Sequence, residues 1–262
     1  MNERAFRVGI QLHPQLTTTD DLRRAWREAD ELGVDSIWVW DHFFPLYGGV
    51  RNRDGDPDGA HFEGWTLLAA MAADTSHAQI GIMVTCNSYR NPDLLADMAR
   101  TVDHISGGRT YLGIGAGWFE RDYTEYGYDF GTAFTRLDAL AEAVPRIKAR
   151  LARLNPGPAG SLPILIGGGG EKVTIPLVAE HADAWNAFGP PDSYARKNRL
   201  LDQACGRIGR DPLDVERTIL IETPEVTDAK AFVEAGASHL IVEAAHPFDL
   251  GPLRDLLGRA GG

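Results

Sequence analysis

Two polar residues, Asp41 and His42, follow an apolar run in the stretch SIWVWDHFFPL at residues 36–46. An imidazole can give or take a proton near neutral pH, and a carboxylate beside it can accept a hydrogen bond from a ligand ring. Two interpretations fit the pair. Asp41 and His42 form part of a chemical site, or Asp41 caps the following loop while His42 packs in the interior.

Two glycine-rich segments, GIGAG at 113–117 and GGGG at 167–170, also follow apolar runs. Four consecutive glycines before a helix expected to begin at Glu171 favour an anion site, because the backbone can approach closely and helix N-terminal N–H groups attract negative charge. The alternative is a flexible tight turn. GIGAG lacks the G-x-G-x-x-G spacing of a dinucleotide fingerprint, so its glycines are expected to clear room for a flat ring or a phosphate tail.

A metal site is disfavoured. His13 and His61 could join Asp41 and His42 as ligands, as in barrel hydrolases, but the first apolar run carries no H-x-H pair and no carboxylate convincingly ends the last one. The two cysteines, Cys86 and Cys205, are too few for a disulfide framework and lack metal-ligand spacing. Both are expected to be reduced and inert.

The elements that position these residues alternate along the whole chain. Apolar runs at 7–12, 36–41, 78–85, 110–117, 162–169, 182–189, 216–222 and 238–245 are each followed by an amphipathic segment. Such alternation predicts a parallel sheet covered by helices on both faces. Eight units in 262 residues predict an α/β fold, a closed (β/α)8 TIM barrel rather than an open doubly wound sheet, in one domain over 1–262.

In such a barrel the active site lies at the C-terminal ends of the strands. The polar endings of the first three strands and the glycines after the fourth and fifth are therefore expected to form one contiguous arc. The substrate pocket is expected to be bordered by Gln11, His13, His61 and Trp118.

The composition, 44% hydrophobic and 24% charged, is that of a soluble globular protein. A net charge of −11 argues against a general binder of nucleic acids or anionic membranes, although backbone dipoles could still hold one anionic ligand. No segment approaches the roughly 20 apolar residues of a membrane span, and no signal peptide is visible. We expect a cytoplasmic protein that binds small molecules.

Four segments, in their order and spacing, resemble the luciferase-like flavin and deazaflavin oxidoreductases, especially the F420-dependent branch. The resemblance covers residues 7 to about 190 strongly and the rest loosely. It implies a luciferase-like barrel that binds coenzyme F420 or FMN at its C-terminal mouth, and it allows a homodimer. The segments are WVWDHFF, GIMVTCNSYRNP, ISGGRTYLGIGAGWFERDYTEYG and PILIGGGGEKVTIPLVAEHADAWN.

Carried over to this sequence, the resemblance implies that Asp41 binds near the deazaflavin ring and that His42 is the catalytic proton donor or base. It also implies a bulged third strand with a non-prolyl cis peptide, expected between Met83 and Val84, that backs the ring. The remaining cofactor-binding positions that it implies are Thr85 in the bulge, Gly115 and Ala116 beside the cofactor, and Gly167, Gly168, Gly169 and Gly170 at the phosphate.

Three departures limit the resemblance. Related F420-dependent sugar-phosphate dehydrogenases carry Trp and Glu where this chain has Leu46 and Ala116, so that reaction is not expected. The connection before the fifth strand is short and lacks a long Pro-rich stretch, which predicts an open site or one closed by a partner subunit. The long polar loop 43–65 is the candidate for a substitute lid.

The favoured hypothesis is an F420-dependent oxidoreductase that transfers a hydride between F420 and an unidentified small organic substrate. An FMN-dependent luciferase-like monooxygenase and a non-catalytic flavin or deazaflavin binder are the alternatives. A metal-dependent barrel hydrolase is the least favoured.

Overall fold

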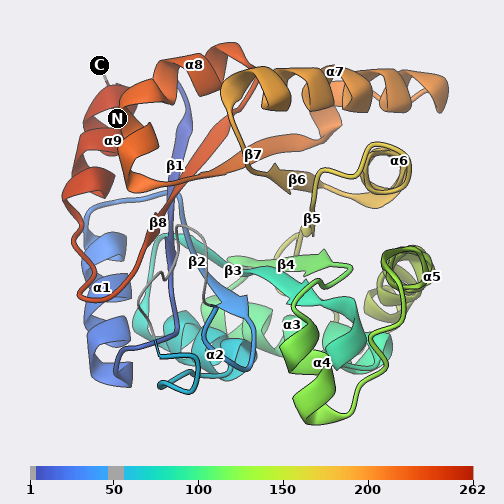
Figure 1. Ribbon diagram of the computed structural model, residues 1–262, viewed down its shortest axis with the longest axis horizontal. Coiled ribbons are helices and arrows are strands. Elements are labelled where there is room, and N and C mark those ends of the chain that lie inside the picture. The colour runs from blue at the N-terminus through green and yellow to red at the C-terminus, as the bar shows by residue number, and fades with distance from the viewer. Residues whose placement is uncertain (1–3, 47–55, 262) are drawn as a thin grey trace.

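The computed structural model describes residues 4–46 and 56–261, and its eight strands close into one barrel. Neighbouring strands are parallel and follow one another in sequence order, with β1 paired to β8 (Figure 1). The expected (β/α)8 barrel is therefore confirmed. The strands are β1 (Arg7–Leu12), β2 (Ser36–Asp41), β3 (Gln79–Cys86), β4 (Thr110–Gly115), β5 (Ile164–Gly167), β6 (Ala184–Ala187), β7 (Glu216–Ile221) and β8 (His239–Ala244).

Helices surround the barrel, and side chains from their apolar faces pack on the outward side chains of the strands (Figure 1). They are α1 (Thr19–Glu31), α2 (Gly64–Asp74), α3 (Pro92–Ser106), α4 (Glu120–Tyr126), α5 (Ala133–Leu151), α6 (Thr174–His181), α7 (Pro191–Arg207), α8 (Ala229–Glu234) and α9 (Gly251–Gly261), with short 3-10 helices η1 (Asn87–Tyr89), η2 (Pro212–Asp214) and η3 (Thr223–Asp228). The helix expected from Glu171 begins instead at Thr174, because residues 171–173 form a turn.

Successive side chains of a strand point alternately to the helices outside the barrel and to the barrel interior. On β2, Ile37 and Val39 belong to the layer packed under the helices, whereas Trp38 belongs to the interior cluster. At the other end of the barrel, Glu216 accepts hydrogen bonds from Arg7 and from the Tyr111 hydroxyl, and it contacts His239. This half-buried polar group closes the barrel opposite the mouth.

Strand β3 carries the expected bulge. Its register shifts against β2 between Val39 and Asp41 and against β4 between Gly81 and Thr85. The peptide bond between Met83 and Val84 is cis, which confirms the prediction made for this position. Because of the shift, the consecutive residues Met83 and Val84 both line the mouth of the barrel.

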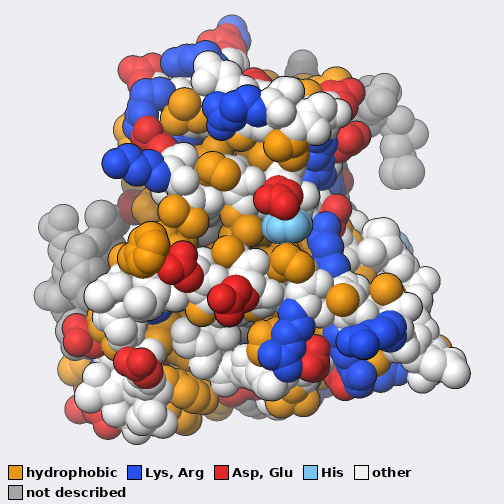
Figure 2. Space-filling model, turned by 90° about the vertical axis from the view of Figure 1, so that its right-hand side faces the viewer, with side chains coloured by type: hydrophobic (Ala, Val, Ile, Leu, Met, Phe, Trp, Pro, Cys, Tyr) orange, Lys and Arg blue, Asp and Glu red, His pale blue; other side chains and the backbone are white. Residues whose placement is uncertain are grey.

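The loop considered as a lid is described only in part, since residues 47–55 lie outside the described residues. Its described end pairs Gln15 with His61 in an isolated bridge beside β1. Charged side chains of both signs are interspersed with hydrophobic ones on the face that Figure 2 shows. In the described ranges no helix has the length and apolar character needed to cross a membrane.

Candidate active site

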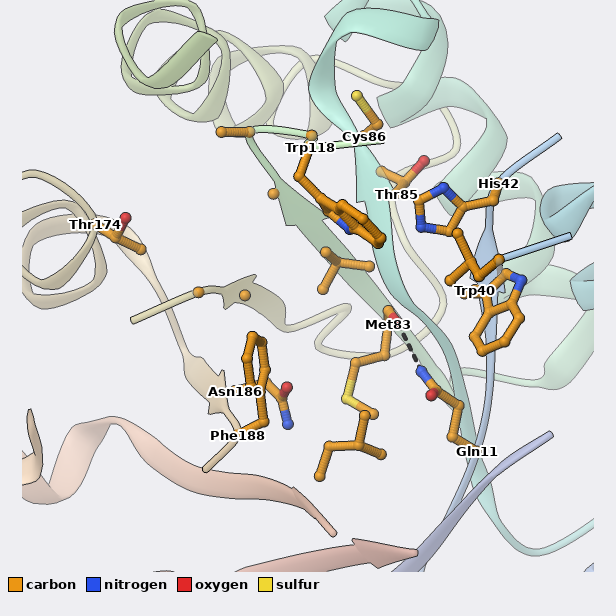
Figure 3. A pocket seen from close by; sticks show the side chains of 18 of the residues that line it. Gln11, Trp40, His42, Met83, Thr85, Cys86, Trp118, Thr174, Asn186 and Phe188 are labelled. Atoms are coloured by element: carbon orange, nitrogen blue, oxygen red, sulfur yellow. Dashed lines mark hydrogen bonds between the residues drawn. The ribbon is translucent and has the colours of Figure 1, made fainter. Parts of the chain in front are cut away.

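A cavity of about 330 Å3 lies at the C-terminal ends of the strands (Figure 3). It brings together side chains from β1, β2, β3 and β6 with the glycines that follow β4 and β5. Of the predicted site residues, the cavity is lined by Gln11, His42, Met83, Val84, Thr85, Gly115, Ala116, Trp118, Gly167 and Gly168. The lining also contains Leu46, Cys86 and Gly117, which the sequence analysis considered without assigning them to the site, and Trp40, Leu137, Thr174, Asn186, Phe188 and Leu220, which it missed.

His42 stands at the edge of the cavity and is held from behind by Asp122 of α4. Its Nδ1 lies 2.7 Å from Asp122 Oδ2, and the Asp122 side chain is fully buried. Oδ2 also accepts from the Tyr89 hydroxyl at 2.6 Å, and Oδ1 accepts from the Phe43 N–H at 3.0 Å. Burial raises the pKa of Tyr89, so its hydroxyl stays protonated and donates. Because an ionised carboxylate only accepts, Nδ1 carries a proton and Nε2 is the atom available for chemistry.

Asp41 lies outside the lining, although His42 follows it directly. Its two oxygens accept from the Arg90 guanidinium at 2.5 and 3.0 Å, and the Thr85 hydroxyl donates to the same carboxylate. Burial raises the pKa of Asp41, and the Arg90 charge opposes that rise. Arg90 also pairs with Glu63, the N-cap of α2. Through Thr85 and Arg90, Asp41 thus links the β3 bulge to the start of α2. The predicted contact of Asp41 with a cofactor ring stays a prediction.

His13 and His61 were expected to border the substrate pocket, but both lie behind Trp40. The His13 ring packs on Trp40 with 4.2 Å between ring centroids, and the Trp40 Nε1–H donates to His61 Nε2 at 3.1 Å. Burial, helped by the nearby His42, lowers the pKa of His61 to about 4, so His61 is a neutral acceptor at pH 7. The described residues contain no group of three or more His, Cys, Asp and Glu side chains arranged to hold a metal ion.

The glycines of β4 make room for strand β3, and the expectation that GIGAG also clears room for a ring or a phosphate tail stays a prediction. A Cβ on Gly113 would collide with the Ile82 carbonyl oxygen, and one on Gly115 would lie 2.8 Å from Val84 Cγ2. A Cβ on Gly167 would lie 2.8 Å from Val84 Cγ1. Val84 therefore fills the space that these glycines leave, and Gly115 and Gly167 expose their backbone to the cavity beside it.

The turn after β5 lies at the end of the cavity that is farther from His42 (Figure 3). Gly168 adopts a φ of +121°, its N–H donates to the Asn186 carbonyl, and its carbonyl accepts from Trp185 Nε1. Gly169 and Gly170 lie beyond the lining, and a Cβ on Gly169 would collide with the Lys197 ammonium. Helix α6 then begins without a side-chain N-cap. A glycine turn before a helix N-terminus, with an ammonium beside it, suits an anionic group.

Gln11 presents an unused acceptor at the base of the cavity. Its Nε2–H donates to the Met83 carbonyl at 2.7 Å, and a carbonyl can only accept, so the amide orientation is fixed. Its Oε1 is buried without a hydrogen-bond partner among the described atoms. A bound donor would satisfy this oxygen. Together with the Val84 wall and the glycine turn, it fits a flat ring with N–H groups and an anionic tail.

Two lining positions set this chain apart from the sugar-phosphate dehydrogenases that its sequence resembles. Leu46 and Ala116 both face the cavity. The Gln15 side chain fixes the Leu46 backbone, since its Oε1 accepts from the Leu46 N–H at 2.7 Å and its Nε2 donates to the Leu46 carbonyl at 3.3 Å. The hydrocarbon side chain of Leu46 is therefore a fixed part of the wall.

Comparison with known proteins gives one family. The model of the family described as luciferase-like monooxygenase matches residues 5–248. A phthiodiolone/phenolphthiodiolone dimycocerosates ketoreductase of Mycobacterium tuberculosis is 29% identical to this chain. The match covers 79% of this chain and 62% of the length of the ketoreductase. An F420-dependent glucose-6-phosphate dehydrogenase of Amycolatopsis mediterranei is 30% identical over 55% of this chain and 41% of its own length.

Solved structures share the fold at lower identity. An F420-dependent secondary alcohol dehydrogenase, in complex with an F420–acetone adduct, aligns with a TM-score of 0.82 and 17% identity over 97% of this chain and 98% of the other. The oxygenating constituent of 3,6-diketocamphane monooxygenase from Pseudomonas putida, in complex with FMN, aligns with a TM-score of 0.74 and 16% identity over 99% of this chain and 98% of the other.

Proposed function

We propose that this chain, which belongs to the luciferase-like monooxygenase family, is an F420-dependent oxidoreductase that transfers a hydride between F420 and a small organic substrate. The observation that carries the proposal is the His42–Asp122 pair at the edge of a cavity whose other end is the glycine turn. One proton-transfer group beside a ring-sized space is what hydride transfer to or from an oxygen-bearing carbon requires.

The residues that would hold the cofactor lie along the cavity. Met83 and Val84 would support the ring from the β3 side, and Gln11 Oε1 would accept from a donor of the ring or of the substrate. The tail would reach the turn at Gly167–Gly170, where Lys197 stands over Gly169. F420, when bound, would supply a carbon that gives or takes a hydride.

The chain's own contribution is to move one proton and to limit water. With Nδ1 donating to Asp122, Nε2 of His42 takes the proton of an alcohol or returns it to a carbonyl oxygen. The Trp118 ring meets His42 edge-on, with 5.6 Å between centroids, and Trp40 lines the same side of the cavity. These indole rings surround the imidazole with apolar surface, which strengthens its hydrogen bonds.

Tryptophan fluorescence provides the test, because Trp40 and Trp118 line the cavity. Titration with F420 is expected to quench the emission saturably, and F420 is expected to be reduced or its reduced form oxidised when a substrate is added. Lys197→Gln should weaken F420 binding, and the matched surface change Lys230→Gln, on an 89% exposed side chain, should not. Tight FMN binding with no response to F420 would overturn the choice of cofactor.

An FMN-dependent monooxygenase is the second candidate, favoured by the shared fold with an FMN complex. In that case FMN alone would quench the tryptophans, and substrate turnover would consume oxygen. A His42→Ala variant addresses the non-catalytic alternative. It should bind the cofactor normally and lose turnover, whereas unchanged turnover would remove His42 from the chemistry.

A further inference from the structure

The cavity is uncharged at the end where a substrate would meet His42. None of the described residues that line it is Asp, Glu, Lys or Arg, and its ionisable side chains are His42 and Cys86. Burial raises the pKa of the Cys86 thiol, which contacts the Tyr123 hydroxyl at 3.0 Å, so this thiol is neutral at pH 7. The large side chains of the lining are apolar: Trp40, Leu46, Met83, Trp118, Phe188 and Leu220.

Cationic side chains outside the lining are held by other groups of the protein. The Arg90 guanidinium is engaged by Asp41 and Glu63. The Arg136 guanidinium donates to the Gly117 and Phe130 carbonyls and lies over the Phe130 ring. Lys197 stands at the opposite end, over the glycine turn. A phosphate or carboxylate in the cavity would lose its hydration without meeting a Lys or Arg side chain among the described lining residues, which is unfavourable.

Leu46 and Phe188 are two apolar lining residues on different walls of the cavity. Leu46 stands on the β2 side with its backbone clamped by Gln15. Phe188 follows β6 on the opposite wall and is 65% exposed (Figure 3). Trp118, 61% exposed, lies at the rim near His42. Exposed aromatic side chains at a rim favour an apolar ligand body over a hydrated one.

We infer that the substrate is an uncharged ketone or secondary alcohol with a hydrocarbon body, and that Leu46 and Phe188 select it. The inference rests on the proposed function. In the oxidative direction a hydride leaves the carbinol carbon for oxidised F420 with both electrons of the C–H bond. The hydroxyl proton passes to His42 Nε2 and the C=O bond forms. Reduction by reduced F420 reverses each transfer.

The test compares two methyl ketones of equal chain length, one ending in a methyl group and one ending in a carboxylate. The kcat/KM of the neutral ketone with reduced F420 is expected to exceed that of the charged ketone by at least about 100-fold. Phe188→Lys should shrink this ratio by about tenfold or more, because it places an ammonium at the rim. Leu213→Lys, the same kind of change at a 90% exposed position outside the cavity, should leave the ratio unchanged.

A binding measurement without cofactor gives a second readout. The neutral ketone should quench the tryptophan emission of the wild-type chain at lower concentration than the charged ketone does. Equal use of both ketones, with F420 bound and turned over, would overturn the inference and leave the proposed function standing. Failure of F420 to bind would overturn the proposed function, and the order of quenching by the two ketones would still decide the inference.

Discussion

Replacing Asp122 by Asn tests whether this carboxylate positions His42 for proton transfer. The side chain keeps its shape, and the Phe43 N–H can still donate to Oδ1. In the wild-type chain Oδ2 accepts from His42 Nδ1 and from the Tyr89 hydroxyl. In the variant an amide NH2 group replaces Oδ2. The amide would donate to Nδ1 instead. The neutral imidazole would then carry its proton on Nε2 and could not accept one there.

The size of the effect follows from the hydrogen bond that is lost. The 2.7 Å contact involves a fully buried carboxylate and a 12% exposed imidazole, so water screens it little. A net value of about 1.5–3 kcal/mol for a hydrogen bond to a charged group corresponds, at about 1.4 kcal/mol per decade, to a loss of roughly 10- to 150-fold in kcat. Alcohol oxidation should lose more than ketone reduction, because oxidation needs an acceptor at Nε2.

Steady-state kinetics in both directions, with F420 affinity and thermal midpoint measured on the same samples, would check this. Asp58→Asn is the matched control, since Asp58 is 76% exposed and pairs with Arg121 away from the cavity. Adding Asp122→Asn to His42→Ala should cause no further loss, because the two residues act as a unit. An Asp122→Asn enzyme that binds F420 normally and keeps kcat within about threefold in both directions would refute the positioning role.

Three further predictions concern stability. Gly113→Ala should lower the free energy of unfolding by more than about 3 kcal/mol in urea titration, because the new Cβ would meet the backbone at Ile82. The control Gly258→Ala, in open space on α9, should be neutral or stabilise the chain by up to about 1 kcal/mol. Burial would raise the pKa of Glu216, but His239 and Arg7 outweigh it and lower the pKa to about 2. The carboxylate therefore adds roughly 3 kcal/mol of stability above pH 5 that is lost as the pH falls towards 2, and Glu216→Gln should flatten this loss in acid titrations followed by circular dichroism. Arg90→Met should cost about 3–5 kcal/mol by leaving Asp41 unpaired, and adding Asp41→Asn should restore part of the loss.

Sequence patterns predicted the scaffold well because each strand is a continuous apolar run with a polar end. The bounds of β1 and β2 match the runs 7–12 and 36–41. Strands β5 and β6 are shorter than their runs, with four residues each, because the glycines at 168–170 and the residues around Phe188 leave the sheet to form the mouth.

Asp41 and His42 were predicted to have different roles, and strand geometry explains why His42 lines the cavity and Asp41 does not. Successive side chains on a strand face opposite sides. Trp38, Trp40 and His42 therefore face the barrel axis, and Asp41 faces the helices, where Arg90 meets it. This parity was readable from the sequence.

Asp122 illustrates what periodicity cannot supply. It is separated from His42 by 80 residues and sits in the polar segment WFERDY, where nothing in the local pattern marks one carboxylate as buried. Only tertiary packing brings α4, which follows β4, next to the residue that follows β2. Partners of this kind are fixed by tertiary packing, whereas strands and caps are fixed by local residues.

The β3 bulge and the glycines of β4 and β5 form one steric unit, which explains why glycine-rich sequence alone was ambiguous. Val84 projects towards the axis at the same height as Gly115 and Gly167, and a Cβ at either position would lie 2.8 Å from its methyl groups. Those glycines are therefore accounted for by packing. Gly169 differs, because the group that it makes room for is an ammonium, that of Lys197. A glycine opposite a backbone or an apolar side chain thus marks packing, whereas a glycine opposite a cation marks the place in this turn where an anion would be recognised.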